Sequence, residues 1–243
     1  MYNEHMSRKA RFLIALATYN ERENLPTLTT QIFTFASDAD ILVIDDSSPD
    51  GTAHWIEEQM QNDVRFKLIK RTGKQGLGTA ILAAIDYAMQ NDYDFLINMD
   101  ADLSHPPRFL PSIRAKAEEG FDVVIGSRYV PGGEIKGWAW SRRLMSYGIN
   151  FYARCLLGLK TRDNSGSFRC YRTALLRRLN SQSILSRGYS FFEEILFRLR
   201  KLDGTFAEVP ITFEERQRGK SKLNVKEIII ALWLLLRIGI FRA

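Results

Sequence analysis

The chain of 243 residues lacks most of the features that mark secreted, membrane-spanning and metal-cluster proteins. It has only two cysteines, Cys155 and Cys170, and their spacing is not that of a metal site. The first residues are polar and charged, without the apolar stretch of a secretory signal, and no run of about 18 apolar residues occurs. We therefore expect two buried free thiols, a reducing compartment and no ordinary transmembrane helix.

The composition is that of a folded, mildly basic protein. Hydrophobic residues make up 45% and charged residues 26% of the chain, which is enough for one large domain with a sizeable core. The net charge of +6 favours an anionic partner: a nucleotide, a phosphate, an acidic membrane surface or a nucleic acid. Composition alone does not distinguish among them.

A pair of aspartates stands at the end of a short apolar run. Phe95-Leu96-Ile97 leads through Asn98 and Met99 to Asp100-Ala101-Asp102. The pattern predicts a buried strand with Asp100 and Asp102 at its C-terminal end, where residues two apart can share one side. Two such carboxylates repel each other unless a cation lies between them, and Mg²⁺ or Mn²⁺ suits an oxygen site of this kind. The simpler alternative is a polar loop with solvated aspartates.

Apolar runs and helical segments alternate through the first half of the chain. The runs lie at residues 12–17, 41–44, 66–69, 95–97 and 122–125, and helices are expected at 24–35, 52–60, 79–89 and 107–119. Such alternation predicts an α/β fold with a mostly parallel sheet and a ligand site at the C-terminal ends of its strands. A further strand at 206–211 carries Pro210, which is expected at a sheet edge or at a strand end.

The loops after these strands allow more than one interpretation. Asp45 and Asp46 are adjacent acids that favour a functional role, whereas Thr52 is read as a helix cap. The glycine-containing basic loop at 71–78 opens a helix and is compatible with phosphate binding or with close packing of that helix start. Ser190 and Glu193 have the spacing of a capping box.

The second half adds basic and aromatic segments. The helix expected at 141–157 suits a lipid interface, single-stranded nucleic acid or an ordinary amphipathic surface. The tail at 228–242 is apolar on nearly all sides, so we expect membrane-surface docking or self-association, with burial on its own domain as the alternative. The basic loop at 213–222 is either a solvated charge run or a segment that closes over a phosphate.

Motifs across the chain together resemble one enzyme family. They are Thr18-Tyr19-Asn20-Glu21-Arg22-Glu23-Asn24, Asp45 to Thr52, Gly76-Leu77-Gly78, Met99 to Pro106, Gly126-Ser127-Arg128-Tyr129, Asp163 to Arg169, Gly188-Tyr189-Ser190-Phe191 and Arg216-x-x-Gly219-x-Ser221-Lys222. In this order they resemble the dolichol-phosphate (polyprenol-phosphate) mannosyltransferases, a branch of the inverting GT-A glycosyltransferases of family 2. The resemblance covers about residues 12–222.

The resemblance implies transfer of mannose from GDP-mannose to a polyprenyl phosphate, with inversion and with Mg²⁺ or Mn²⁺. It assigns the nucleotide sugar to Ala17, Tyr19, Glu21, Ile44, Asp46, Asp100, Ala101, Asp102, Arg216 and Lys222. It assigns the acceptor phosphate to Arg128, Arg142 and Ser146, the metal to Asp100, Asp102 and Ser104, and catalysis to Asp102 and Arg128. A phosphate monoester is already anionic, so cations that position it replace the general base that a hydroxyl acceptor needs.

This chain departs from the family pattern at some positions. Ala17 stands where Pro is usual, Ser104 where some relatives have a metal-binding Gln, and residues 164–167 read Asn-Ser-Gly-Ser instead of Pro-Thr-Ser-Gly. Two alternatives stay open: the same fold with UDP-glucose or another donor, and a non-catalytic module that binds an anionic surface.

The resemblance and the composition also lead to expectations about organisation. We expect a flexible start at 1–11, a GT-A domain at 12–222 with a nucleotide-sugar half (12–127) and an acceptor half (128–222), and a hydrophobic interfacial helix at 223–243. The expected location is peripheral, at the cytoplasmic face of a membrane. A homo-oligomer or a membrane subunit is a further expected partner, and nucleic acid is not.

Overall fold

A computed structural model describes residues 8–188, 190–215 and 225–241. Its centre is a seven-stranded sheet in the order β3-β2-β1-β4-β7-β5-β8. The strands are β1 (Phe12–Thr18), β2 (Asp40–Asp45), β3 (Phe66–Lys70), β4 (Phe95–Asp100), β5 (Val123–Ser127), β7 (Arg169–Arg172) and β8 (Phe206–Pro210). Only β7 runs antiparallel among the strands of this sheet, and it lies between β4 and β5. The prediction of a mostly parallel sheet with an edge strand near Pro210 is confirmed.

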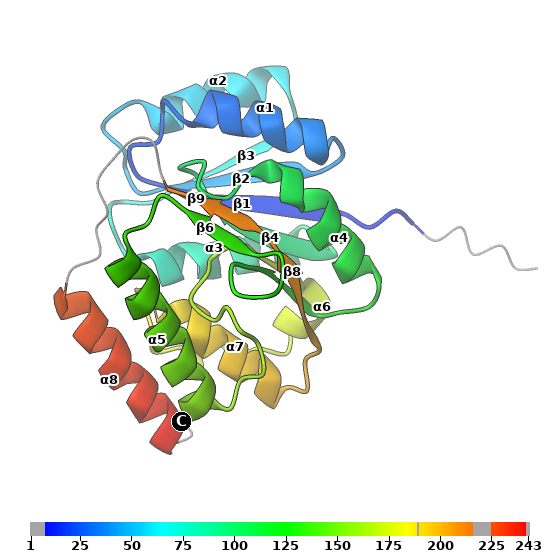
Figure 1. Ribbon diagram of the computed structural model, residues 1–243. Helices are drawn as coiled ribbons and strands as arrows, with labels where there is room; N and C mark the ends of the chain where they lie inside the picture. The colour runs from blue at the N-terminus through cyan, green and yellow to red at the C-terminus, as the bar shows by residue number, and fades with distance from the viewer. Residues whose placement is uncertain (1–7, 189, 216–224, 242–243) are drawn as a thin grey trace, which may run out of the picture.

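Helices cover both faces of the sheet (Figure 1). One face packs against α1 (Leu25–Phe35), α2 (Thr52–Asn62) and α4 (Leu110–Glu118), and the other against α3 (Leu77–Gln90), α6 (Thr173–Leu176) and α7 (Phe191–Lys201). Strand β1 contributes to the core on both faces of the sheet, because successive side chains of a strand point to opposite faces. Its Leu13 and Ala15 belong to the core under α3, whereas Ile14 and Leu16 belong to the core under α1.

Two further helices lie side by side beyond the sheet (Figure 1): α5 (Trp140–Leu157) and α8 (Val225–Phe241). Leu235 and Ile238 of α8 are buried, as are Ala153 and Leu157 of α5. Helix α8 is thus neither fully buried nor fully exposed, because the side opposite Leu235 and Ile238 faces outward. Within the described ranges, no helix combines the length and the apolarity needed to cross a membrane.

A small parallel pair, β6 (Glu134–Lys136) and β9 (Thr212–Glu214), lies at the C-terminal side of the main sheet. The remaining elements are two short 3₁₀ turns, at Pro107–Phe109 and Ser181–Ser183. The Glu214 amide of β9 donates to the Ser104 carbonyl at 3.1 Å. The small pair therefore fixes the loop that follows β4.

Some local predictions were wrong. Gly51, with φ of 85°, precedes α2, and the Asp50 carboxylate accepts from the Thr52 amide at 3.0 Å, so Thr52 is not the cap. Ser190 makes no side-chain capping bond among the described residues, which excludes the capping box there. Cys170 is buried as expected, but Cys155 is exposed on α5.

The start of α3 is a site of close packing. A Cβ atom on Gly78 would lie 2.8 Å from Cδ2 of Phe191 and 2.9 Å from the Ser186 carbonyl oxygen. The Gly78 amide donates to the Arg187 carbonyl at 2.9 Å. Of the two interpretations of the glycine loop, the geometry at Gly78 favours close packing.

This contact predicts opposite effects for two glycine substitutions. Gly78→Ala should lower the free energy of unfolding by about 1–3 kcal/mol, because the Ser186 backbone cannot yield without moving its segment. Gly148→Ala, at an exposed α5 position where the new methyl group would meet no other segment of the chain within 4 Å, should raise it by about 0.5–1 kcal/mol. Urea denaturation of the two variants measures both values. Equal effects of the same sign would contradict the packing argument.

Candidate active site

The C-terminal ends of three neighbouring parallel strands bring the predicted nucleotide residues together. In the sheet register Ala17 of β1 pairs with Ile44 of β2 on one side and with Asp100 of β4 on the other. Asp46 follows β2 directly, and Ala101 follows β4. Residues that lie far apart in the sequence therefore line a single edge of the sheet.

The loops at this edge are held in unusual backbone conformations. Asn20 after β1, Ser47 after β2 and Leu103 after β4 have φ of 63°, 56° and 64°. A non-glycine residue in this left-handed region is uncommon, and strain of this kind clusters at functional sites. The three loops thus have fixed shapes at the place where the sequence predicts a ligand.

The two adjacent aspartates at the end of β2 have different tasks. Asp45 is buried and accepts from the Thr18 hydroxyl at 3.0 Å and the Ser48 amide at 2.9 Å, so it holds the two loops together. Asp46 accepts from Nε of Arg71 at 2.5 Å. Arg71 is a site residue that the sequence reasoning missed, because nothing in its spacing links it to Asp46.

Tyr19 and Glu21 flank this edge. The Lys74 ammonium lies 3.6 Å from the centre of the Tyr19 ring, a cation–π contact that links the glycine loop to the loop after β1. Oε2 of Glu21 accepts from the Asn24 side-chain amide at 2.7 Å.

The paired carboxylates at the C-terminal end of β4 are held by several hydrogen bonds. Oδ1 of Asp102 accepts from the Ser104 amide at 3.1 Å and from the Ser104 hydroxyl at 2.6 Å. Oδ1 of Asp100 accepts from the Ser167 hydroxyl at 2.7 Å. The Asp100 amide donates to Nδ1 of His105 at 3.1 Å. His105 is buried, and burial lowers its pKa, so its ring is a neutral acceptor for this bond.

This donor set fits a hard divalent cation. Asp100 and Asp102 supply carboxylate oxygens, and the Asp100 side chain is 36% exposed at the sheet edge. The described residues contain no group of three or more His, Cys, Asp and Glu side chains that could enclose a metal. Mg²⁺ and Mn²⁺ are commonly held by one or two carboxylates, with substrate phosphates completing the shell. The arrangement therefore suits a cation that binds together with a diphosphate.

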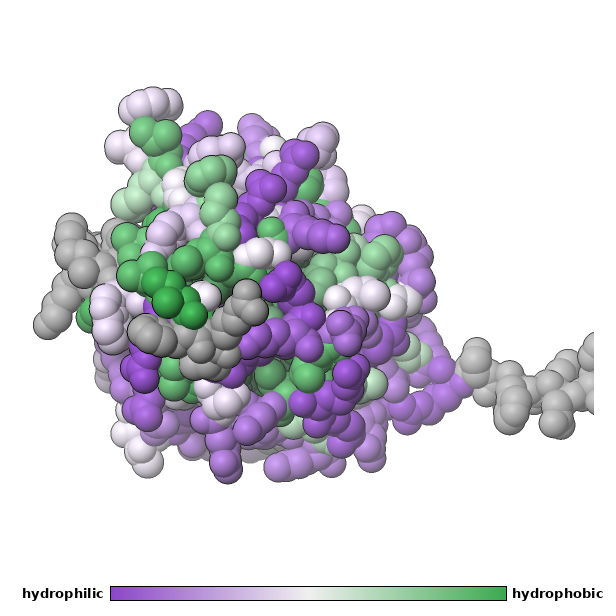
Figure 2. All heavy atoms as spheres, turned by 90° about the horizontal axis from the view of Figure 1, so that it is seen from below, coloured by the Kyte–Doolittle hydropathy of each residue, from purple (hydrophilic) through white to green (hydrophobic). Residues whose placement is uncertain are grey.

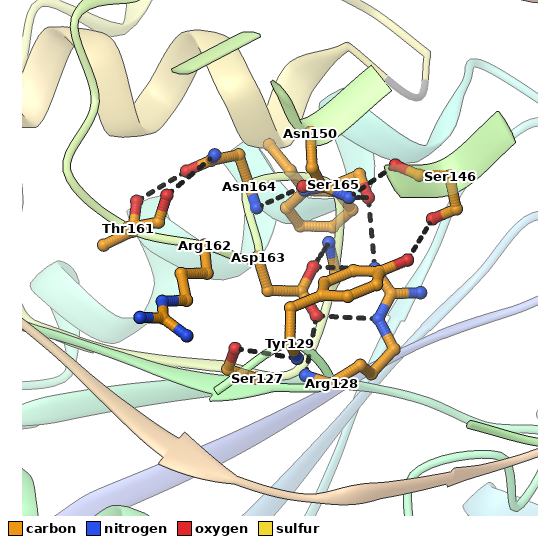
Figure 3. Close-up of polar contacts among 12 residues, drawn as sticks. Ser127, Arg128, Tyr129, Ser146, Asn150, Thr161, Arg162, Asp163, Asn164 and Ser165 are labelled. Atoms are coloured by element: carbon orange, nitrogen blue, oxygen red, sulfur yellow. Dashed lines mark hydrogen bonds and ion pairs between the residues drawn. The ribbon is translucent and has the colours of Figure 1, made fainter. Parts of the chain in front are cut away.

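Across the edge, Arg128 forms a buried ion pair with Asp163 (Figure 3). Its Nε and Nη2 donate to the two carboxylate oxygens, each at 2.7 Å, and its backbone amide donates at 2.9 Å. Burial alone would raise the pKa of Asp163, but the Arg128 charge and hydrogen bonds outweigh it and lower that pKa. Asp163 lies inside a recognised motif, yet its sequence position gives no sign of its partner.

The predicted acceptor residues on α5 join the same region. The Tyr129 hydroxyl donates to Oγ of Ser146 at 2.7 Å, and the Asn150 side-chain amide donates to the Ser146 carbonyl at 2.9 Å (Figure 3). Nη1 of Arg142 donates to Oε1 of Glu215 at 3.0 Å. Tyr129 and Asn150 were not predicted as site residues. The remaining predicted residues, Arg216 and Lys222, lie outside the described residues.

Comparison with known proteins gives relatives along nearly the whole chain. The sequence profile of "Glycosyl transferase family 2" matches residues 13–179. An "Undecaprenyl-phosphate mannosyltransferase" of Micrococcus luteus is 40% identical over 214 residues, which cover 88% of each chain. A "Polyprenol monophosphomannose synthase" of Mycolicibacterium smegmatis is 39% identical over 231 residues, 95% of this chain and 87% of the relative.

Solved structures share the fold at low sequence identity. Glucosyl-3-phosphoglycerate synthase of Mycobacterium tuberculosis with phosphoglyceric acid has a TM-score of 0.67 and 16% identity, covering 96% of this chain and 80% of its own. The same enzyme with Mn²⁺, uridine diphosphate and phosphoglyceric acid has a TM-score of 0.66 and 16% identity, covering 96% and 78%. The predicted GT-A fold is thereby confirmed.

A buried acid, Glu193, lies near the Arg128–Asp163 ion pair. Glu193 on α7 is 3% exposed, and its Oε2 has no hydrogen-bond partner among the described residues. Burial raises the pKa of Glu193 to about 7, although its own backbone amide and the nearby Arg169 act in the opposite direction. The folded protein therefore binds a proton here over a pH range in which the unfolded chain does not.

This raised pKa predicts a pH-dependent effect of Glu193→Gln. Between about pH 4.5 and 7 the folded state binds more protons at this site than the unfolded state, so Glu193 destabilises the fold increasingly as pH rises. The stability of Glu193→Gln relative to the wild type should grow through this window, by at most about 1.4 kcal/mol per pH unit, and level off above it. Urea denaturation from pH 5 to pH 8 measures the difference. Glu118→Gln, at an exposed position of α4, is the control, and a pH-independent difference for Glu193→Gln would contradict the assignment.

Proposed function

This chain belongs to glycosyl transferase family 2, in its polyprenol-phosphate mannosyltransferase branch, and on that premise we propose that it transfers mannose from GDP-mannose to a polyprenyl phosphate. The relatives from Micrococcus luteus and Mycolicibacterium smegmatis are named for undecaprenyl phosphate and for polyprenol monophosphomannose, which supports a lipid phosphate as acceptor.

Basic and acidic side chains lie at separate positions along one edge of the sheet, and this arrangement is the main support for the proposal. Asp100 ends β4 and Asp102 follows it, whereas Arg128 follows β5, and the start of the antiparallel strand β7 lies between these two strand ends. A donor diphosphate with its cation fits the carboxylate side, and an anionic acceptor fits the guanidinium side. The two substrates would then meet between the strands.

The proposed chemistry needs no dedicated general base. An oxygen of the acceptor phosphate attacks C1 of mannose as the bond from C1 to the GDP oxygen breaks, and GDP leaves with that electron pair. The nucleophile is already anionic at neutral pH, so Arg128 and Arg142 would orient it without removing a proton. Attack from the face opposite GDP inverts the anomeric centre.

Charge on the departing diphosphate is proposed to be stabilised at the carboxylate side. Asp100 and Asp102 would hold Mg²⁺ or Mn²⁺, which when bound supplies positive charge to the leaving group. Ser104 donates its hydroxyl to Asp102, so we assign it the task of orienting that carboxylate, and its role as a metal ligand stays a prediction. The roles of Arg216 and Lys222 over the donor stay predictions as well.

We further propose that the protein docks on a membrane surface through α5 and α8. On α5 the exposed apolar side chains include Leu144 and Phe151, and on α8 they include Trp233. Figure 2 shows hydrophobic residues gathered on one side of the molecule and hydrophilic residues over the rest of that face. Because α5 also carries Arg142 and Ser146, docking by this helix would bring the acceptor side next to the lipid. A bilayer is therefore a better occupant for this surface than a second protein chain.

The first test follows radiolabelled sugar into an organic-extractable lipid. Wild-type protein with polyprenyl phosphate and Mn²⁺ should form lipid product from GDP-mannose and none from UDP-glucose, and EDTA should abolish it. Asp102→Ala should fold normally and lose activity by about 100-fold or more, because metal stabilisation of the leaving group contributes several kcal/mol.

Glu118→Ala, an exposed carboxylate on α4, is the matched control and should keep full activity. Product from UDP-glucose alone would replace the donor and keep the fold and the metal site. Turnover by Asp102→Ala at the wild-type rate would refute the metal assignment.

The second test measures membrane association by sedimentation with vesicles of phosphatidylcholine and phosphatidylglycerol. The double variant Leu144→Ser/Trp233→Ser should partition at least about tenfold more weakly, since two apolar side chains no longer leave water. Its counterpart Met60→Ser/Val64→Ser changes exposed apolar residues in the last turn of α2 and just after it, and should bind like the wild type. Equal binding of the two double variants would show that this surface does not contact lipid.

A further inference from the structure

The turn at residues 163–167 contacts both the donor side and the acceptor side of the site. It precedes β7, the antiparallel strand between β4 and β5. One of its ends is bound to the strand that carries Asp100, and the other is bound to the arginine that follows β5. The two ends of the turn make hydrogen bonds with different partners.

At the donor end, Ser167 is held by β4 at two points. Its hydroxyl donates to Oδ1 of Asp100 at 2.7 Å, and its carbonyl accepts from the Asn98 side-chain amide at 2.8 Å. Ser167 is 8% exposed, so little water competes for its hydroxyl. The other oxygen of the carboxylate, Oδ2, lies 3.8 Å from Nδ1 of His105. Ser167 thus determines which Asp100 oxygen faces the turn.

At the acceptor end, Ser165 is held by hydrogen bonds as Ser167 is at the donor end, but its partners are Arg128 and Asn150. Its hydroxyl oxygen accepts from Nη2 of Arg128 at 3.1 Å and from the Asn150 side-chain amide at 3.0 Å (Figure 3). The Gly166 amide donates to Oδ1 of Asp163 at 3.0 Å. Two serines of one turn therefore serve opposite sides of the reaction centre.

We infer that Ser167 is a positioning residue for the donor, acting through Asp100 on the cation-bound diphosphate. The Asp100 carboxylate ends a strand at a partly exposed edge, where its side chain could rotate away without the Ser167 hydroxyl. Fixing it in advance lowers the cost of assembling the cation and the diphosphate. The inference rests on the proposed function only in that the donor is a nucleotide diphosphate bound with a divalent cation.

The test measures nucleotide binding by calorimetry, without turnover. Wild type, Ser167→Ala, Ser167→Thr and Ser165→Ala are titrated with GDP and with UDP, each in Mn²⁺ and again in EDTA. With Mn²⁺, Ser167→Ala should bind the preferred nucleotide about fivefold more weakly, since a hydrogen bond to a charged carboxylate is lost. In EDTA it should bind like the wild type. Ser167→Thr keeps the hydroxyl and should restore the Mn²⁺-dependent affinity.

Ser165→Ala is the matched control from the same turn. It should leave nucleotide affinity unchanged and raise the KM for polyprenyl phosphate, because it loses the contact with Arg128. Wild-type affinity of Ser167→Ala in Mn²⁺ would overturn the inference, as would equal weakening by Ser165→Ala or an equal loss in EDTA. A wild-type protein that binds neither GDP nor UDP would instead overturn the proposed function, so the two failures can be distinguished.

Discussion

The proposed acceptor side depends on one interaction, the ion pair between Arg128 and Asp163. Removing both charges from water is costly, and the cost is offset only where the geometry is good and every hydrogen-bonding position is used. The Asp163 carboxylate meets this condition, since it accepts from the Arg128 side chain and backbone and from the Gly166 amide. On β8, the Glu208 carboxylate in turn accepts from the Asp163 amide at 3.0 Å. The pair thereby connects the end of β5, the turn before β7 and the edge strand β8, and the orientation of the guanidinium follows from all of them.

Much of the architecture could be predicted because it depends on local pattern. Short apolar runs followed by polar residues identify parallel strands and their C-terminal ends, and Asp100 and Asp102 lie where the run at 95–97 places them. The position of β7 could not be predicted in this way. Its run of residues shows a strand, but its insertion between β4 and β5 depends on pairings with segments far away in the chain. The burial of Asp45 was missed for a related reason, because a carboxylate that organises two loops looks the same in sequence as one that binds a ligand.

In the candidate site, too, some features could be predicted from the sequence and others depend on contacts between distant residues. The family resemblance predicts a role for Arg128, Arg142 and Ser146, yet it does not show that Arg128 is fixed by Asp163 or that Ser146 bonds to Tyr129. The Ser167 contact with Asp100 joins residues 67 positions apart. Contacts of this kind form only when the sheet edge is folded, and they leave no periodic pattern in the sequence. The wrong capping box at Ser190 is instructive too, because the spacing suited a cap while the Glu193 side chain turned into the interior.

Helix α5 carries different residues on its two sides. The inner side holds Ser146 and Asn150 near the reaction centre, and the outer side exposes Leu144, Tyr147 and Phe151. A rigid helix links these two sides, so a protein seated on lipid by one side has its other side at a fixed depth and orientation. If the protein docks as proposed, it would search for its lipid acceptor in two dimensions, and its rate would follow the surface density of that lipid more closely than the amount of lipid per volume. Diluting the acceptor with inert lipid would then lower the rate, whereas diluting the whole suspension would change it much less.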